Sequence, residues 1–124
     1  MHHSRLAGFI LDCRTDDLER ATAFWSAALG MADLGEDGPT YRRLDATPRD
    51  LTIEIQAVAH DSRVHLDVES DDVEAEVVRL ERLGAKRVAQ VKTWWVLEAP
   101  TGQRFCVVRA KEDLAGASGA TRWP

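Results

Sequence analysis

Apolar and polar residues alternate strictly along residues 63–69, which read RVHLDVE. Such alternation predicts a strand with one apolar, half-buried side, and its polar side carries His65, Asp67 and Glu69. The SDD that follows at residues 70–72 is typical of a helix start, because short oxygen-bearing side chains accept hydrogen bonds from the unpaired N–H groups of a first turn. The polar side of the strand is therefore expected either to face solvent or to line a cavity.

The same pattern occurs a second time in the chain. GFILDCRTDDLE at residues 8–19 aligns without a gap with RVHLDVESDDVE at residues 63–74. An amphipathic helical pattern follows each aspartate pair and ends at Gly30 in the first copy and at Gly84 in the second. Both glycines suit the left-handed conformation that closes many helices. In the first helix the apolar stripe predicts burial of Leu18, Ala21, Phe24 or Trp25, and Ala28-Leu29.

Three strand candidates follow each helix. They are residues 31–36, 40–46 and 51–58 in the first copy, and residues 86–91, 94–99 and 104–110 in the second. The chain is thus predicted to be a single α+β domain of two tandem βαβββ modules, residues 6–58 and 63–109, with a tail at 110–124. Two copies are too few for a solenoid, so the modules are expected to close on each other or on a partner chain.

Composition narrows the function classes. A chain of 124 residues with 44% hydrophobic and 30% charged residues fits one globular domain, and its net charge of -5 argues against a nucleic-acid partner. No apolar run is long enough to cross a bilayer, so no membrane role is expected. Cys13 and Cys106 lie in apolar runs and are expected to be free thiols in the cytoplasm. His2-His3 is either native or a tag remnant, and we set it aside from site assignment.

Three motifs resemble the vicinal oxygen chelate superfamily, which includes glyoxalase I, bleomycin-resistance proteins and extradiol dioxygenases. They are DDLERATAFWSAALG, VHLDVESDDVEAEVVRLERLGA and APTGQRFCVV, and the resemblance covers residues 6–109. The resemblance implies a cup-shaped mixed sheet with helices outside and a ligand cavity inside. It also implies a divalent ion, held by side chains from the first and last strand of each module, that stabilises an anion of the substrate.

The resemblance places four residues at the ligand positions of such an ion, namely Ile10, Glu54, His65 and Cys106. Ile10 cannot bind a metal, and a thiol suits magnesium or manganese poorly. Glutamate, histidine and cysteine with water would suit zinc. The other interpretation makes Cys106 a small buried apolar residue and the site metal-free.

A metal-free site would depend on Asp12 and Asp67, which align in the repeat and fall on the His65 side of their strands. If both line one cavity, one carboxyl can act as an acid or base and His65 can carry protons. The structural alternative is that each aspartate pairs with backbone or with an arginine such as Arg42, Arg43 or Arg104.

Aromatic side chains are candidates for ligand contact. Trp94 and Trp95 point to opposite faces of a strand, so one of them is expected to face the cavity with Tyr41 and Ile10. Trp123 is expected either to be disordered or to clasp a partner.

We therefore expect a homodimer that binds a small oxygenated organic molecule. It would be a lyase, isomerase or dioxygenase-type enzyme with a partial metal site, in which His65 and Glu54 hold a metal or transfer a proton and Asp12 and Asp67 support them. The alternative is a metal-free protein that sequesters a small molecule, as bleomycin-resistance proteins do.

Overall fold

The computed structural model describes residues 1–124 and contains nine strands, two α-helices and one short 3-10 helix. In chain order these are β1 (His2–Arg14), α1 (Leu18–Leu29), β2 (Asp33–Glu36), β3 (Tyr41–Leu44), η1 (Thr47–Arg49), β4 (Thr52–Val58), β5 (Arg63–Ser70), α2 (Val73–Arg82), β6 (Lys86–Val91), β7 (Trp94–Glu98), β8 (Arg104–Arg109) and β9 (Thr121–Trp123). The predicted α+β class and the order βαβββ, repeated twice, are confirmed. The chain divides into two compact units, described separately below.

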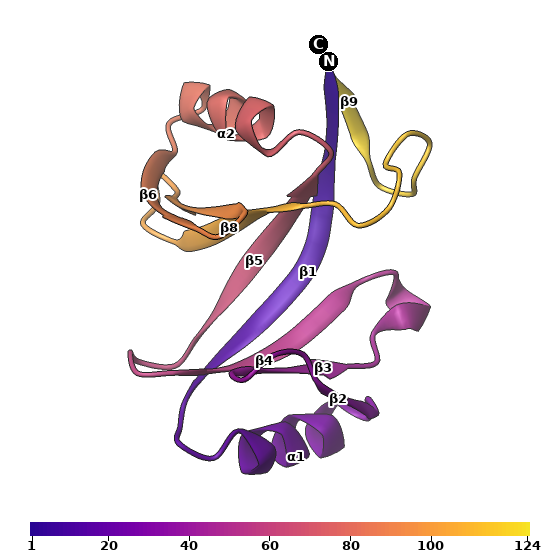
Figure 1. Cartoon of the computed structure of the whole chain (residues 1–124), viewed down its shortest axis with the longest axis vertical. Helices are drawn as coiled ribbons and strands as arrows, with labels where there is room; N and C mark the ends of the chain where they lie inside the picture. The colour runs from indigo at the N-terminus through magenta and orange to yellow at the C-terminus, as the bar shows by residue number, and fades with distance from the viewer. The chain divides into compact units, whose positions relative to one another are not determined.

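The first compact unit is Gly8–His65. Its strands lie in the order β2-β3-β4-β1, and β4 runs parallel to β1 and antiparallel to β3. Helix α1 packs against β2, β3 and β4 (Figure 1). Leu44 and Ile55 are fully buried on the sheet, and Thr22 is fully buried on α1. Helix α1 does not cover the opposite face of this sheet.

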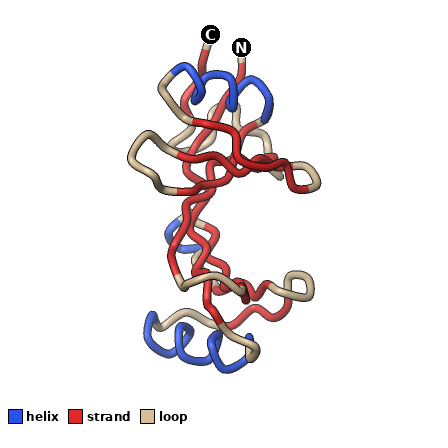
Figure 2. The backbone as a smooth tube through the Cα atoms, turned by 90° about the vertical axis from the view of Figure 1, so that its left-hand side faces the viewer, coloured by secondary structure: helices blue, strands red, loops and turns tan.

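The second compact unit combines Met1–Ala7 with Leu66–Pro124. Its strands lie in the order β1-β5-β8-β7-β6, and β9 pairs antiparallel with the start of β1. The two chain ends consequently lie side by side, as both ribbon views show (Figures 1 and 2). Val77 of α2 packs with Leu97 and Val107 in the core between helix and sheet.

Both helices begin at the second aspartate of the repeated pair. The Asp17 carboxylate accepts a hydrogen bond from the Arg20 N–H, and the Asp72 carboxylate accepts one from the Ala75 N–H, each at 3.0 Å. Helix α1 closes at Gly30, whose φ is 67°. The predicted capping chemistry is confirmed because each carboxylate satisfies an N–H that the first turn leaves unpaired.

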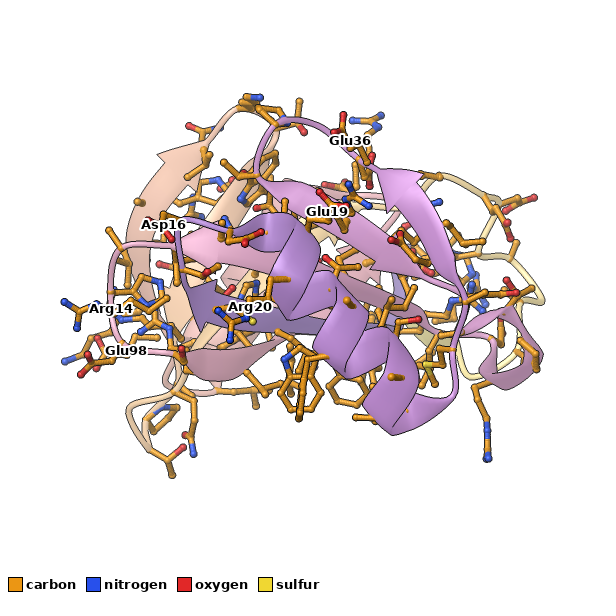
Figure 3. All side chains as sticks on the ribbon, turned by 90° about the horizontal axis from the view of Figure 1, so that it is seen from below. Arg14, Asp16, Glu19, Arg20, Glu36 and Glu98 are labelled. Atoms are coloured by element: carbon orange, nitrogen blue, oxygen red, sulfur yellow. The ribbon has the colours of Figure 1, made fainter.

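The predicted buried stripe of α1 is wrong in part. Phe24 is 63% exposed and Leu29 is 44% exposed, whereas Thr22 is fully buried and Trp25 is half-buried. The buried side of α1 therefore runs through Leu18, Thr22 and Trp25, which are spaced by four and three residues. Figure 3 labels the polar residues Glu19 and Arg20 on α1, and both are exposed.

The apolar side of β5 is not its buried side. Val64 and Leu66 are 58% and 43% exposed, whereas His65 and Asp67 are only partly exposed. The prediction of a half-buried strand with an apolar buried side is therefore wrong for these positions. The polar side of β5, which carries His65 and Asp67, is the more enclosed one, so it does not simply face solvent.

The two chain ends are integral parts of the second unit. His2 is 4% exposed, its Nε2 lies 3.1 Å from Oε1 of the fully buried Glu76, and the His3 N–H donates to Asp71 at 2.7 Å. Trp123 donates its indole N–H to Ser4 at 2.9 Å. His2 and His3 therefore contribute to the packing of this unit, and Trp123 contacts its own chain.

Candidate functional site

The face of the first unit opposite α1 carries a row of polar residues. Register places Asp12 of β1 opposite Gln56 of β4, and Gln56 opposite Tyr41 of β3. The row next to it reads Ile10, Glu54 and Arg43 in the same strand order. Residues that are directly opposite in paired strands share a face, so these six side chains project from one side of the sheet.

His65 and Asp12 form the shortest polar contact of this face. The His65 Nδ1–H donates to Asp12 Oδ2 over 2.7 Å, since an ionised carboxylate can only accept. Asp12 is 3% exposed, and its other oxygen, Oδ1, is buried without a hydrogen-bond partner. The bond fixes the tautomer of a neutral His65, with the lone pair on Nε2.

Arg63 supplies the positive charge beside this pair. Its Nε lies 3.6 Å from Asp12 Oδ2, and its side chain is half exposed. Arg63 was missed in the sequence, although it stands two residues before His65 on the same side of the alternating strand. That spacing was the signal that could have identified it.

The arginines predicted as structural partners of the aspartates bind elsewhere. Arg42 contacts Asp33 at 2.9 Å and Arg43 contacts Asp37 at 3.3 Å, rather than Asp12. Asp12 does pair with an arginine, as that alternative holds, but the arginine is Arg63, and Asp12 also pairs with His65.

In the second unit, Asp67 of β5 is the register partner of Cys106 on the parallel strand β8. His65 precedes Asp67 by two residues and so points to the same side of β5. Carboxylate and thiolate are donors that zinc accepts, whereas manganese and magnesium prefer oxygen-rich sets. Asp67 and Cys106 of this unit are therefore donors that suit a zinc-type ion.

Trp94 and Trp95 point to opposite faces of β7, as predicted, and the structure shows which face each side chain occupies. Trp95 packs against the buried cluster beneath α2, with the Arg87 guanidinium 4.8 Å from the centre of its ring. Trp95 is therefore excluded from the ligand-binding face. Trp94, the adjacent residue, projects from the opposite side of β7.

Cys13 is a poor nucleophile in its environment. Burial raises the pKa of its thiol, and the Asp12 charge adds to this, while a hydrogen bond with Trp25 offsets part of the rise. A raised pKa leaves less thiolate near neutral pH, which makes Cys13 a weak candidate for nucleophilic chemistry.

A groove of about 760 Å³ lies away from these residues. It is lined by α2 and both chain ends and contains none of the predicted site residues. The polar face carries the titratable pair, and we therefore place the candidate site there. Neither helix is long and apolar enough to span a membrane.

Comparisons with known proteins agree with this architecture. Residues 8–108 match the model of the glyoxalase-like domain. Methylmalonyl-CoA epimerase from Mycobacterium tuberculosis superposes with a TM-score of 0.66 at 16% identity, over 91% of this chain and 92% of that chain. No curated protein matches the sequence significantly.

Two further solved structures are larger proteins of which the chain covers a part. The Mn(II)-bound glyoxalase from Novosphingobium aromaticivorans gives a TM-score of 0.60 at 19% identity, over 88% of this chain and 41% of that one. An extradiol ring-cleaving dioxygenase from B. fuscum gives 0.56 at 15% identity, over 85% and 32%. The superpositions, at these low sequence identities, show a common fold. Because the matched residues 8–108 span both βαβββ modules, the chain belongs to the glyoxalase-like domain family.

Proposed function

We propose that the protein is an isomerase-type enzyme that moves a proton on a small oxygenated organic molecule. The observation that carries this proposal is the 2.7 Å hydrogen bond between His65 Nδ1 and the buried Asp12 carboxylate. A carboxylate that orients a histidine in this way prepares the other ring nitrogen for proton transfer.

The proton transfer starts at a carbon next to a carbonyl group of the substrate. The C–H bond breaks, its electron pair stays on the substrate as an enolate, and the proton goes to His65 Nε2. The Asp12 carboxylate balances the charge of the imidazolium ion that results, whereas the Arg63 guanidinium, which shares the Asp12 Oδ2 oxygen, opposes protonation of His65. Return of the proton to the neighbouring carbon completes an isomerisation, whereas return to the same carbon from the same face restores the substrate.

Asp12 Oδ1 has a second role in this mechanism. It is buried without a hydrogen-bond partner, and a buried acceptor in that state destabilises the protein. A hydroxyl of the substrate would satisfy it and place the oxygenated carbon beside His65.

A zinc-type ion would be held by His65, with Glu54 and Cys106 as further candidate ligands, and it would take the His65 Nε2 lone pair in place of the proton, because Nδ1 is bonded to Asp12. Such an ion would polarise the substrate carbonyl and stabilise the enolate. Elemental analysis of protein purified without chelator tests this part. A stoichiometric ion that Cys106→Ser removes supports it, whereas metal-free protein that ignores added zinc leaves His65 to act alone.

Solvent deuterium exchange tests the proton transfer. A panel of 2-oxo acids and hydroxyketones is incubated with the protein in D₂O, and loss of the C–H signal adjacent to the carbonyl is followed by NMR. We expect His65→Gln to lower the catalysed exchange rate by about 10²-fold or more. Glu19→Gln, a change at an exposed residue of α1 in the same unit, should leave the rate unchanged. Exchange that survives in His65→Gln would contradict the proposal.

A second candidate is a metal-free protein that sequesters a small molecule. Ile10 favours it, because an apolar residue only 3% exposed stands where the resemblance implies a metal ligand. Such a protein binds members of the panel in thermal-shift measurements, and neither the wild-type protein nor any variant accelerates exchange.

We also propose that the protein is a cytoplasmic homodimer. Phe24, Leu29 and Leu34 of the first unit are exposed apolar residues, and a second copy would cover such a surface. Neither Cys13 nor Cys106 is in a disulfide, which suits a reducing compartment. Light scattering after size-exclusion chromatography should give twice the 13.8 kDa mass of the chain.

A further inference from the structure

Arg43 shares the polar face of the first unit with Asp12. It lies opposite Glu54 of β4, which lies opposite Ile10 of β1, two residues before Asp12 on the same strand. Neighbouring strands are about 4.8 Å apart and alternate residues about 6.6 Å apart, so the Cα atoms of Arg43 and Asp12 are separated by about 12 Å. Both side chains project from the same face, and Glu54 and Ile10 lie between them in the register, so a ligand that contacts both charged ends would lie over these two side chains.

The guanidinium of Arg43 has unused hydrogen-bonding capacity. Its Nε is buried and has no hydrogen-bond partner, and its Nη2 reaches Asp37 only at 3.3 Å. Arg42, on the opposite face of β3, makes a 2.9 Å ion pair with Asp33. A buried N–H without an acceptor destabilises a protein, and the chain supplies no acceptor for the Arg43 Nε. An acceptor on a bound ligand would remove this cost.

We propose that Arg43 binds a carboxylate of the substrate, which makes small oxygenated carboxylic acids the substrate class. This inference rests on the proposed function of the same face. A guanidinium presents parallel N–H groups that match the two oxygens of a carboxylate. The Arg43 side chain is 39% exposed, so a ligand can reach it.

The arrangement assigns separate tasks to the two ends of the face. Arg43 holds the carboxylate, and the carbon that loses its proton lies toward Asp12 and His65. A substrate without a negative charge would leave the Arg43 Nε unsatisfied and would bind more weakly. Arg43 is therefore a specificity-determining residue, and its removal should affect binding of acids more than binding of neutral analogues.

The test compares acids with their methyl esters. Binding of 2-oxobutyrate and methyl 2-oxobutyrate, and of a second acid–ester pair from the hydroxy acids, is measured by ligand-observed NMR titration up to 20 mM, about the upper end of millimolar affinities. Wild-type protein, Arg43→Gln, Arg43→Lys and Arg42→Gln are compared, and circular dichroism checks that each variant is folded. Arg42→Gln is the matched control, because it removes the neighbouring guanidinium on the other face.

We expect wild-type protein and Arg42→Gln to bind the acids about tenfold or more tightly than the esters, the ratio expected of a charge-assisted pair of hydrogen bonds. Arg43→Gln should bind both alike, and Arg43→Lys should retain part of the preference. The inference is overturned if the wild-type protein binds esters as tightly as acids, binds no acid, or keeps its preference in Arg43→Gln.

Carboxylate binding by Arg43 and proton transfer by His65 can be refuted independently of each other. His65→Gln should abolish exchange and leave the acid-over-ester ratio intact, because His65 does not contact the carboxylate. A normal ratio with exchange unaffected by His65→Gln would refute the proton transfer and keep the carboxylate site.

Discussion

At the scale of single residues, Gly8 marks the closest approach between β1 and β4. A Cβ atom at this position would lie 1.7 Å from the carbonyl oxygen of Thr52, and backbone cannot rotate away as a side chain can. We expect Gly8→Ala to lower the free energy of unfolding by about 3 kcal/mol, the upper end of overpacking costs. Gly116→Ala has open space around it and should cost about 1 kcal/mol for its positive φ alone. Urea unfolding of both variants compares them, and equal losses would show that β1 and β4 can move apart.

Glu76 gives the protein an acid-sensitive interior. Burial raises the pKa of its carboxyl, but hydrogen bonds from Arg79, Ser4 and His2 and the charge of Arg79 lower it more, so the net pKa lies below the ordinary 4.5. A carboxyl with a depressed pKa in the folded state stabilises the protein above its unfolded pKa, and this stability is lost as pH falls through the folded pKa.

Stability is therefore expected to fall below pH 4.5 in the wild-type protein and to fall less steeply in Glu76→Gln. At pH 7 the variant should be about 2 kcal/mol less stable, because Arg79 loses the ionised partner that its Nε contacts at 2.5 Å. Urea unfolding between pH 3 and 7 measures both effects, with the exposed Glu112→Gln as control. Parallel pH profiles for wild-type protein and Glu76→Gln would refute the assignment.

At the scale of elements, the aspartate pair before α1 has unequal members. Asp17 accepts the Arg20 N–H, whereas Asp16 is exposed just before the helix (Figure 3). Asp17→Ala should lower the free energy of unfolding by about 1 kcal/mol, and Asp16→Ala by less than about 0.5 kcal/mol. Thermal unfolding of the two variants measures the difference, and a larger effect of Asp16→Ala would mean that the helix starts one residue earlier.

The elements were predictable from sequence because their signals are local. The Asp17 and Asp72 caps, the Gly30 terminus and the alternation in β5 depend only on neighbouring residues. The side of β5 that is enclosed was not predictable, since His65 is enclosed by contacts such as that with Asp12, which is 53 residues away. Hydrophobic patterning assumes that the apolar side is buried, and a site that encloses polar groups violates that assumption.

At the scale of the whole molecule, the repeat predicted two modules but not how the chain shares its strands between compact units. Met1–Ala7 belongs to the unit formed by Leu66–Pro124, and Arg63–His65 belongs to the unit formed by Gly8 onward. Sequence similarity locates repeated elements, whereas this division depends on pairing between residues more than sixty positions apart.

The strand sharing predicts that the second module cannot fold without the start of the chain. Within its unit, the Arg5 Nε donates to Glu69 at 2.6 Å, the Ser70 hydroxyl donates to the His3 carbonyl at 2.9 Å, and β9 pairs with residues 2–4. The fragment 61–124 loses all of these contacts, and its β5 becomes an unprotected edge. We therefore expect it to be unfolded or aggregated at 25 °C, whereas the full chain unfolds cooperatively.

A rearranged chain distinguishes the loss of the Met1–Ala7 contacts from the effect of a shorter chain alone. The two chain ends are neighbours, so Leu66–Pro124 can be joined through a short Gly/Ser linker to Met1–Ala7, which restores the complete unit with few added residues. This chain should give dispersed amide NMR signals and a cooperative urea transition, because His2 and Arg5 regain Glu76 and Glu69. Replacing Arg5 by Ala in it should lower the transition midpoint. Fragment 61–124 folding equally well without Met1–Ala7 would show that the β1 strand is dispensable to the unit, and that the pairing at the chain ends forms only after the fold is complete.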